Sequence, residues 1–410
     1  VSMDEIDACV RRVLHMKEEM GLFEDPYRGL EQQSPGPDTL PHHRQSARDA
    51  ARRSLVLIKN DGDLLPLSRN IKRIAAIGPL ADKQSELMGP WCMAGDEREA
   101  IGFLQGLREV FAQSEILHAK GSAVEAAIDA DLVAQAVKAA HASDVVVLCL
   151  GEDRQHCGEA ASRTKPEPFA CQLDLARAVI ATGKPVILVT AVSRPWILPD
   201  WLVDGSQAIL LAMFGGTEAG RATADIIAGD YNPSARLSIS WPVNAGQIPA
   251  YYNMRSTGRP HDPNNGFSTN FLDAPIEPRF TLGDGLSYTR FELGALQADQ
   301  TSMDEKGLIN LSIDVQNVGA RDGEATLFLF IHDPVAQVTR PSLELKDFAK
   351  AELKAGQSKT VRFVLRADQL RYPGLDLEPR LDNGRIDIII GTSAHARDQK
   401  HVSIDVKLKG

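Results

Sequence analysis

The stretch that decides the fold is residues 145–164, VVVLCLGEDRQHCGEAASRT. Its first six residues are apolar without interruption, which predicts a strand covered on both faces, as in a parallel sheet. From Gly151 the residues become charged and polar, and apolar periodicity resumes only near Leu173, so we expect a long loop between these points. Ligands of open α/β sheets bind beyond the carboxyl ends of the strands. A carboxylate-rich loop at that place is therefore a candidate site.

The overall composition restricts the class of protein. A chain of 410 residues is long enough for two or three domains, and its net charge of −10 argues against nucleic-acid binding, which needs a basic face. It has no apolar run of the roughly 18 residues that a membrane span requires. The five cysteines show no CxxC spacing, so we expect free thiols rather than disulfides or a metal site. We expect no cofactor, metal, nucleic-acid or membrane partner.

The first 45 residues are predicted to be one helix and a linker. Ser2 and Glu5 have the spacing of a capping box, and apolar residues follow at helical intervals up to Gly21. Because the chain opens at a helix cap rather than at a methionine, we interpret this helix as the last one of a domain outside the sequence; the alternative is a helix packed on the next domain. Residues 24–45 are rich in Pro, Gly, Gln and His, which is typical of a linker.

Residues 46–245 alternate between helical and strand patterns, which predicts a mostly parallel, three-layer α/β sandwich. We expect Thr217 to cap the last of its helices. Helices are expected at 46–57, 98–112, 130–142, 171–182 and 218–228, and strands at 71–77, 115–118, 145–150, 185–192, 208–214 and 236–241.

The last part of the chain has a different pattern. Residues 246–287 contain few apolar runs and are interpreted as a long linking loop, in which Tyr251, Tyr252 and Arg259 either contact a sugar or, as we favour, pin the loop to the domain beneath it. Residues 288–410 contain short alternating segments separated by turns, which predicts an antiparallel β-sandwich. Its strands are expected to include 308–315, 325–331, 360–365 and 385–390.

Three carboxylates compete for a functional role in the loop that follows residue 151. Glu152 lies at the strand end, Glu159 lies seven residues further, and Glu167 lies between two prolines. One interpretation is that a carboxyl group on a loop over a cleft exchanges a proton during bond cleavage. The other is a solvated loop whose charges pair with Arg154 and Arg163, and composition alone favours that second interpretation.

Motifs follow one another along nearly the whole chain: RRVLHMKEEMGLFEDPY, ARRSLVLIKNDGDLLPL, IAAIGPLAD, MGPW, SDVVVLCLGE, GEAASRT, GKPVILV, MFGGTEAG, IIAGDYNPSARLSISWP, GQIPAYYN, TGRP, LGDGLSYTRFE and VQNVGARDGEA. In this order they resemble glycoside hydrolase family 3, in particular its bacterial periplasmic β-glucosidase branch.

The resemblance implies a specific architecture and chemistry. Family members are similar in having a (β/α)8 barrel, an α/β sandwich and often a fibronectin type III-like domain, so this chain looks like the last barrel helix with the two later domains. They are retaining glycosidases, with an aspartate nucleophile in the barrel and a glutamate acid/base in the α/β domain. The EAxSR-like motif of this branch places the acid/base at Glu159, with Glu152 as the runner-up. Ser162 and Arg163 of the same motif are implied, more weakly, to touch substrate or position the loop.

We therefore expect the C-terminal portion of a retaining β-glycosidase that hydrolyses terminal non-reducing β-D-glucosyl residues of oligosaccharides or of aryl or alkyl β-glycosides. The expected partner is the absent barrel, which would supply the nucleophile, so the isolated chain should have little activity. The resemblance also implies a periplasmic or secreted bacterial protein and leaves a homodimer open. The alternative is a non-catalytic carbohydrate-binding or assembly module. The two are distinguished by whether Glu159 faces an exposed cleft.

Overall fold

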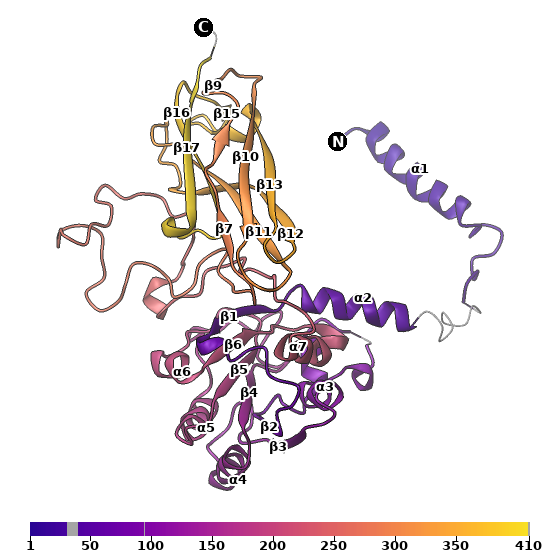
Figure 1. Cartoon of the computed structure of the whole chain (residues 1–410). Helices are drawn as coiled ribbons and strands as arrows, with labels where there is room; N and C mark the ends of the chain where they lie inside the picture. Colours follow the sequence, from indigo (N-terminus) through magenta and orange to yellow (C-terminus); the bar gives the residue numbers. More distant parts are fainter. Residues whose placement is uncertain (31–39, 94, 409–410) are drawn as a thin grey trace. The chain divides into compact units, whose positions relative to one another are not determined.

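The computed structural model of the chain describes residues 1–30, 40–93 and 95–408, which divide into two units, Val1–Ser46 and Ala47–Gly410 (Figure 1). In the first unit α1 (Met3–Glu19) begins at the predicted capping box. Ser2 Oγ accepts from the Glu5 amide, and the Glu5 carboxylate accepts from the Ser2 amide at 2.7 Å. The helix ends at Glu19, with Met20 as its C-cap, before Gly21 at φ 67°. Its assignment to a further domain stays a prediction.

The boundary between linker and helix was predicted wrongly. α2 (Leu40–Arg52) begins inside the expected linker and ends five residues before the expected residue 57, while residues 31–39 lie outside the described part. Pro41 is tolerated there because the first amides of a helix have no intrahelical acceptor. The helix is followed by β1 (Val56–Asn60), whose apolar residues pair with another strand instead of extending the helix.

The end of α2 is tied to the α/β domain by a buried carboxylate. Asp225 is fully buried on α7 (Ala219–Ala228), and it accepts from Arg48 Nε at 2.7 Å and from Arg52 Nε at 2.6 Å. Two guanidinium groups satisfy both carboxylate oxygens, which offsets the cost of burying the charge. Residues after Ser46 are thereby fixed to the domain that carries the candidate loop.

The α/β domain is built on a six-stranded sheet in the order β1-β6-β5-β4-β2-β3 (Figure 1). All neighbouring strands are parallel except β1 and β6, so the expected mostly parallel sheet is confirmed. Its other strands are β2 (Arg73–Ile77), β3 (Glu115–Ala119), β4 (Val145–Gly151), β5 (Val186–Ala191) and β6 (Ala208–Leu211). Its helices are α3 (Phe103–Val110), α4 (Ala130–His141), α5 (Ala170–Ile180), α6 (Asp200–Gly205) and α7.

Strand β4 lies in the middle of this sheet and is buried on both faces. Val145 and Val147 belong to one apolar core, together with residues of α3 and α7. Val146 and Leu148 belong to a second core on the opposite face, together with residues of α4 and α5. Successive side chains of a strand point to opposite faces, so an uninterrupted apolar run is what two helical layers require.

Two local predictions at the end of the domain were wrong. Residues 236–241 do not form a strand of the sheet; Trp241 makes an isolated bridge to Phe280, because the segment pairs with the linking loop instead. Thr217 does not cap α7 with its side chain, because it lies inside a 3-10 turn (Gly216–Glu218) that precedes the helix.

The C-terminal domain is the expected β-sandwich. One sheet contains β13-β10-β7 with β8 also paired to β10, and the other has the order β12-β11-β16-β17-β9. Inward-facing residues of both sheets form one core. The strands are β7 (Phe291–Leu293), β8 (Gln297–Ala298), β9 (Ser302–Met303), β10 (Leu308–Asn317), β11 (Gly323–His332), β12 (Glu344–Leu353), β13 (Ser358–Arg366), β16 (Gly384–Gly391) and β17 (Gln399–Val406), with a separate ribbon of β14 (Tyr372–Pro373) and β15 (Pro379–Arg380).

The linking loop is irregular, as predicted, apart from a 3-10 turn at Ala245–Gln247. Tyr252 packs against Phe330 with ring centroids 6.0 Å apart, and its hydroxyl accepts from the Leu345 amide at 3.4 Å. Tyr252 thus pins the loop, although to the sandwich, whereas Tyr251 and Arg259 are exposed.

Within the described residues, none of the helices has the length and apolarity to cross a membrane.

Candidate active site

The loop predicted to carry the site runs from Glu152, directly after β4, to Phe169 at the start of α5. It borders a hollow of ≈ 830 Å³ at the carboxyl edge of the sheet. The lining comes from this loop, from the segments that follow β5 and β6, and from the segment that follows β2: Pro90, Trp91, Gly158, Glu159, Ala161, Ser162, Val192, Ser193, Arg194, Met213 and Phe214. The hollow therefore lies where parallel α/β sheets usually bind ligands.

Glu159 stands at the tip of the loop. The residues on each side of it, Gly158 at φ 98° and Ala160 at φ 57°, adopt left-handed backbone conformations. Position 158 needs glycine because a Cβ on Gly158 would lie 2.9 Å from Pro90 Cβ. Glu159 is exposed and lines the hollow, and its carboxylate has no hydrogen bond or ion pair with the part of the chain that the structure describes. This carboxyl group is free to act on an external group.

Glu152 lies at the base of the loop in the opposite environment. Its side chain is fully buried. One carboxylate oxygen accepts from Arg163 Nη1 at 3.0 Å and lies 3.2 Å from Arg194 Nε, and the other accepts from Ser193 Oγ at 2.9 Å. Both oxygens are therefore occupied by residues that hold the loop, and Glu152 is absent from the lining of the hollow.

Arg194 was not singled out from the sequence, yet it connects the base of the loop with both sides of its tip. It donates from Nη2 to the carbonyl of His156 at 2.7 Å and to the carbonyl of Ala161 at 3.1 Å, in addition to its contact with Glu152. A planar guanidinium can bridge several acceptors in this way, whereas an ammonium group cannot hold the same geometry. The pattern that could have revealed it is a charged residue three positions after the end of β5, the strand that neighbours β4.

The two arginines expected to pair with the loop carboxylates behave differently. Arg163 contacts Glu152, donates from Nη2 to the Glu167 carbonyl at 3.2 Å, and lies over the Phe169 ring at 4.3 Å. It therefore holds the loop. Arg154 does not pair with the carboxylates of the loop, because its guanidinium forms ion pairs with Glu86, 3.6 Å from Nε, and with Glu97.

Of the other residues singled out, Ser162 is exposed and lines the hollow next to Glu159. Glu167 is exposed as well, but it is not part of that lining. The motif around Glu159 thus contributes two side chains to the hollow, Glu159 and Ser162, and one side chain, Arg163, to its support.

His156 anchors the loop before the tip. Its Nδ1 lies 2.6 Å from Asp153, its Nε2 lies 2.7 Å from Glu125, and its ring packs edge-on against Phe169 at 4.7 Å. Burial acts to lower the pKa of His156, but the hydrogen bonds to Glu125 and Asp153 together outweigh it, so the pKa is raised above its usual 6.5. The imidazole is a charged anchor in mildly acidic solution.

Cys157, which follows His156, does not have the properties of a nucleophile. It is buried, and its thiol donates to the Asp153 carbonyl at 3.1 Å. Burial, with a smaller effect of the nearby Glu152, raises its pKa to about 11. A thiol with such a pKa is protonated at neutral pH and cannot attack a substrate efficiently.

Comparisons with known proteins place this geometry in a family. The glycosyl hydrolase family 3 C-terminal domain matches residues 55–288, and the fibronectin type III-like domain matches residues 325–394. The chain belongs to glycoside hydrolase family 3.

Individual relatives match along nearly the whole chain. A periplasmic β-glucosidase of Salmonella typhimurium is 37% identical over 96% of this chain and 55% of its own length, and a β-xylosidase of Formosa agariphila is 33% identical over 99% and 56%. The crystal structure of a β-glucosidase from Listeria innocua in complex with isofagomine has a TM-score of 0.90 and 36% identity, over 99% of this chain and 56% of that one. The chain thus spans about half the length of the curated relatives it matches.

Proposed function

We propose that this chain is the C-terminal part of a retaining β-glycosidase, and that Glu159 is its general acid/base. The observation that carries the proposal is the contrast between an unpaired, exposed carboxyl group at the loop tip and a buried, ion-paired one at the loop base. A proton-transfer group must reach the substrate oxygen at hydrogen-bond distance. Glu159 can meet that requirement from the wall of the hollow, whereas Glu152 is enclosed by residues of the chain itself.

The chemistry needs a second carboxylate from residues beyond this sequence, which we propose to lie in the barrel of the longer family members. Retaining glycosidases hold their two carboxyl groups about 5–5.5 Å apart. The second carboxylate attacks the anomeric carbon while Glu159 gives its proton to the departing oxygen, which breaks the glycosidic bond and leaves a glycosyl ester. Glu159 then takes a proton from water as the water oxygen attacks the anomeric carbon, which releases the sugar and regenerates both groups.

The support of the loop fits this role. Arg194 and Arg163 fix its base on Glu152, and His156 fixes the segment before the tip. A reacting group displaced by about 1 Å can cost around a hundredfold in rate, so a loop carrying an acid/base needs such anchors. We propose that Arg163 positions the loop and that Ser162 touches the substrate.

For the substrate we propose terminal non-reducing β-D-glucosyl residues of oligosaccharides or of aryl or alkyl β-glycosides. Relatives named β-glucosidase and β-xylosidase support the wider class of β-glycosides. Trp91, Met213 and Phe214 in the hollow offer apolar surface to a sugar ring or an aglycone. The Salmonella typhimurium relative, named as periplasmic, supports a periplasmic or secreted location.

Complementation tests the proposal. The 410-residue chain is mixed with a separately folded (β/α)8 barrel from a family member, and release of p-nitrophenol from p-nitrophenyl β-D-glucoside is measured. We expect little activity from the chain alone and hydrolysis by the mixture. Glu159→Gln should abolish it, whereas Glu167→Gln, a matched change at an exposed carboxylate of the same loop, should not. If Glu159→Gln hydrolyses as fast as the unmodified chain, Glu159 is not the acid/base; if two folded parts bind each other without hydrolysis, the non-catalytic module is favoured.

A further inference from the structure

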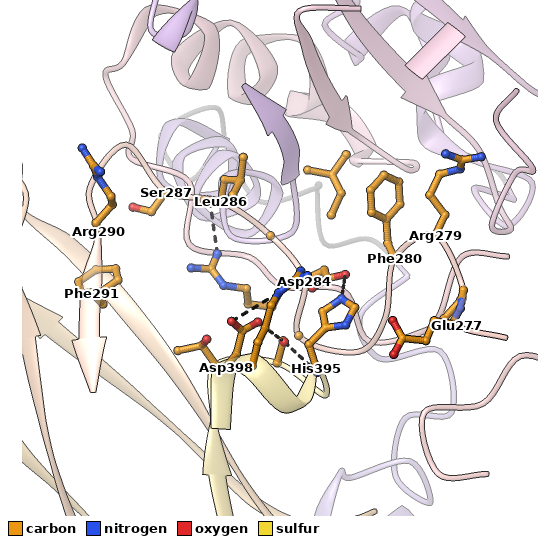
Figure 2. A pocket seen from close by; sticks show the side chains of 18 of the residues that line it. Glu277, Arg279, Phe280, Asp284, Leu286, Ser287, Arg290, Phe291, His395 and Asp398 are labelled. Carbon is orange, nitrogen blue, oxygen red and sulfur yellow. Dashed lines mark hydrogen bonds and ion pairs between the residues drawn. The ribbon is translucent and has the colours of Figure 1, made fainter. Parts of the chain in front are cut away.

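A second cavity lies where the linking segment joins the α/β domain to the sandwich, and the proposed glycosidase function does not use it. Its volume is ≈ 630 Å³, and its walls come from the end of the linking segment, from the segment after α7, and from the turn between β16 and β17. Figure 2 shows Asp284, His395 and Asp398 in the middle of the lining, with Arg290 and Arg279 toward opposite sides. It shares no lining residue with the hollow that contains Glu159.

Arg236 is the unusual residue of this cavity. Its guanidinium donates from Nη1 to two carbonyls, those of Ala235 at 2.8 Å and Leu286 at 3.4 Å, and no carboxylate of the described residues forms an ion pair with it. Most of the side chain is buried, and this burial lowers the pKa of Arg236 to about 10, with Glu324 and Asp284 offsetting only part of the effect. The fold therefore partly buries a cation without giving it an ion-pair partner among the described residues.

The motif LGDGLSY builds the wall over Arg236. Gly285, at φ 153°, packs so closely that a Cβ would lie 2.7 Å from the Ala235 carbonyl oxygen and 3.1 Å from Arg236 Cδ. Gly283, at φ 90°, has the same role on the other side, where a Cβ would lie 2.5 Å from Ser393 Cα. The two glycines let one short segment pack on the α/β domain and on the sandwich while it lines the space between them.

Neither acidic group in the middle of the cavity forms an ion pair with Arg236, and each has another partner. Asp284 accepts from the Thr281 amide at 2.8 Å and lies 3.1 Å from His395 Nε2. Asp398 accepts from Ser393 Oγ at 2.7 Å. Both carboxylates serve to hold the linking segment and the turn in place.

The other arginines add positive charge to the same space. Arg290 is exposed and forms no ion pair within the described residues, and Arg397 lies 3.8 Å from Asp398, at the limit of an ion pair. Arg279 contacts Asp200, but its buried Nε–H has no acceptor in the described part of the chain. Among the acids of the lining only Glu277, which is exposed, is without a partner there.

We propose that this cavity binds a small organic oxyanion, a carboxylate or a phosphate, with Arg236 as its main anchor. A partly buried cation without an ion-pair partner is costly, and a bound oxyanion would supply both the charge and further acceptors for its guanidinium. Guanidinium groups match the planar carboxylate and the phosphate with paired hydrogen bonds. The volume lies within the about 300–1,000 Å³ of typical small-molecule sites. A ligand there contacts both domains and therefore stabilises their junction.

The test uses the 410-residue chain with two probes, inorganic phosphate and D-glucuronate, titrated by calorimetry at constant ionic strength with chloride as the reference. We expect saturable binding of at least one probe and a rise in melting temperature with its concentration. Arg236→Met, which keeps the volume and removes the charge, should weaken binding about tenfold to a hundredfold. Without added anion, this variant should melt at or above the temperature of the unmodified chain. Which probe binds distinguishes a phosphate from a carboxylate ligand.

Arg362→Met is the matched control, because Arg362 is exposed on β13 and lies outside this cavity. It should bind the probe as the unmodified chain does. Hydrogen exchange of the unmodified chain gives a second measurement, in which the probe should protect residues 283–291 and 392–398. The proposal is overturned if neither probe binds saturably, if Arg236→Met binds as well as Arg362→Met, or if protection appears elsewhere.

Discussion

The base and the tip of the loop after β4 carry the same side chain in opposite settings. At the base, Glu152 is fully buried, with two arginines and Ser193 around it. At the tip, Glu159 is exposed, and its carboxylate has no partner in the described residues. The difference teaches how a loop can be fixed and still present a free carboxyl group: the stabilising ion pairs are concentrated where the loop leaves the sheet, and the carboxyl group at the tip has no partner in the described residues.

The largest expected effect is on catalysis at the tip. In the barrel-complemented protein, Glu159→Ala should lower the rate of hydrolysis about 10²–10⁴-fold, the usual contribution of general acid–base catalysis. With 2,4-dinitrophenyl β-D-glucoside, whose leaving group needs no protonation, added azide should restore turnover, because azide attacks the glycosyl ester without a base. Glu167→Ala should hydrolyse like the unmodified protein and be insensitive to azide. If Glu159→Ala forms no glucosyl azide, the assignment of Glu159 as the acid/base is contradicted.

The next effect is on stability at the base. Glu152→Gln leaves two partly buried guanidinium groups without their carboxylate, and we expect a loss of about 3 kcal/mol in the free energy of unfolding. Glu159→Gln should change it by no more than about 0.5 kcal/mol, since the side chain is exposed. Urea denaturation of both variants measures the difference directly. If the two variants are equally stable, Glu152 at the base stabilises the fold no more than Glu159 at the tip.

A smaller effect is expected from the residue that joins the two regions. Arg194→Lys keeps the charge but cannot bridge Glu152 and the carbonyls of His156 and Ala161 together. We expect a loss of about 1–2 kcal/mol in the free energy of unfolding. Hydrogen exchange of residues 156–161 should accelerate in this variant. Unchanged exchange there would show that Arg194 does not hold the tip.

The smallest effect depends on pH. Because the pKa of His156 is raised in the folded state, its charged form adds stability that is fully present below the unfolded pKa of about 6.5 and is lost as the pH rises through the folded pKa. The contribution should be under about 1 kcal/mol, since Glu125 is largely exposed to solvent. The stability difference between the unmodified chain and His156→Gln, measured from pH 5 to 9, should shrink with rising pH. If the stability difference instead grows with pH, the pKa of His156 is not raised in the folded state, and the prediction is wrong.

Much of the fold could be predicted because the chain has strong periodic patterns. The uninterrupted apolar run of β4 and the alternation in β10 reflect burial on two faces and on one face, and the structure has both. The pattern failed at 236–241, where an apolar segment pairs with the linking loop, and at α2, where the helix began within residues that look like a linker. At 236–241 the pairing of Trp241 with the distant Phe280 overrode the local preference.

The site was predictable to a lesser degree. The motif around Glu159 identified a candidate, but nothing in composition separated it from Glu152, seven residues earlier. Arg194 was overlooked because it is 42 positions from Glu152 along the chain and meets it only since β4 and β5 are neighbours in the sheet. Arg236 likewise gains its importance from the packing of Gly285 against it.

The sequence by itself determined the order of a parallel α/β domain and a β-sandwich, and a polar loop at the end of a buried strand, because side-chain periodicity follows directly from backbone geometry. Only the tertiary structure decided which of the two carboxylates is enclosed and which is free, and that Arg236 lines a cavity without an ion-pair partner in the described residues. Burial and pairing are set by residues far apart in the chain, so equal side chains acquire unequal properties only when the fold brings their neighbours together.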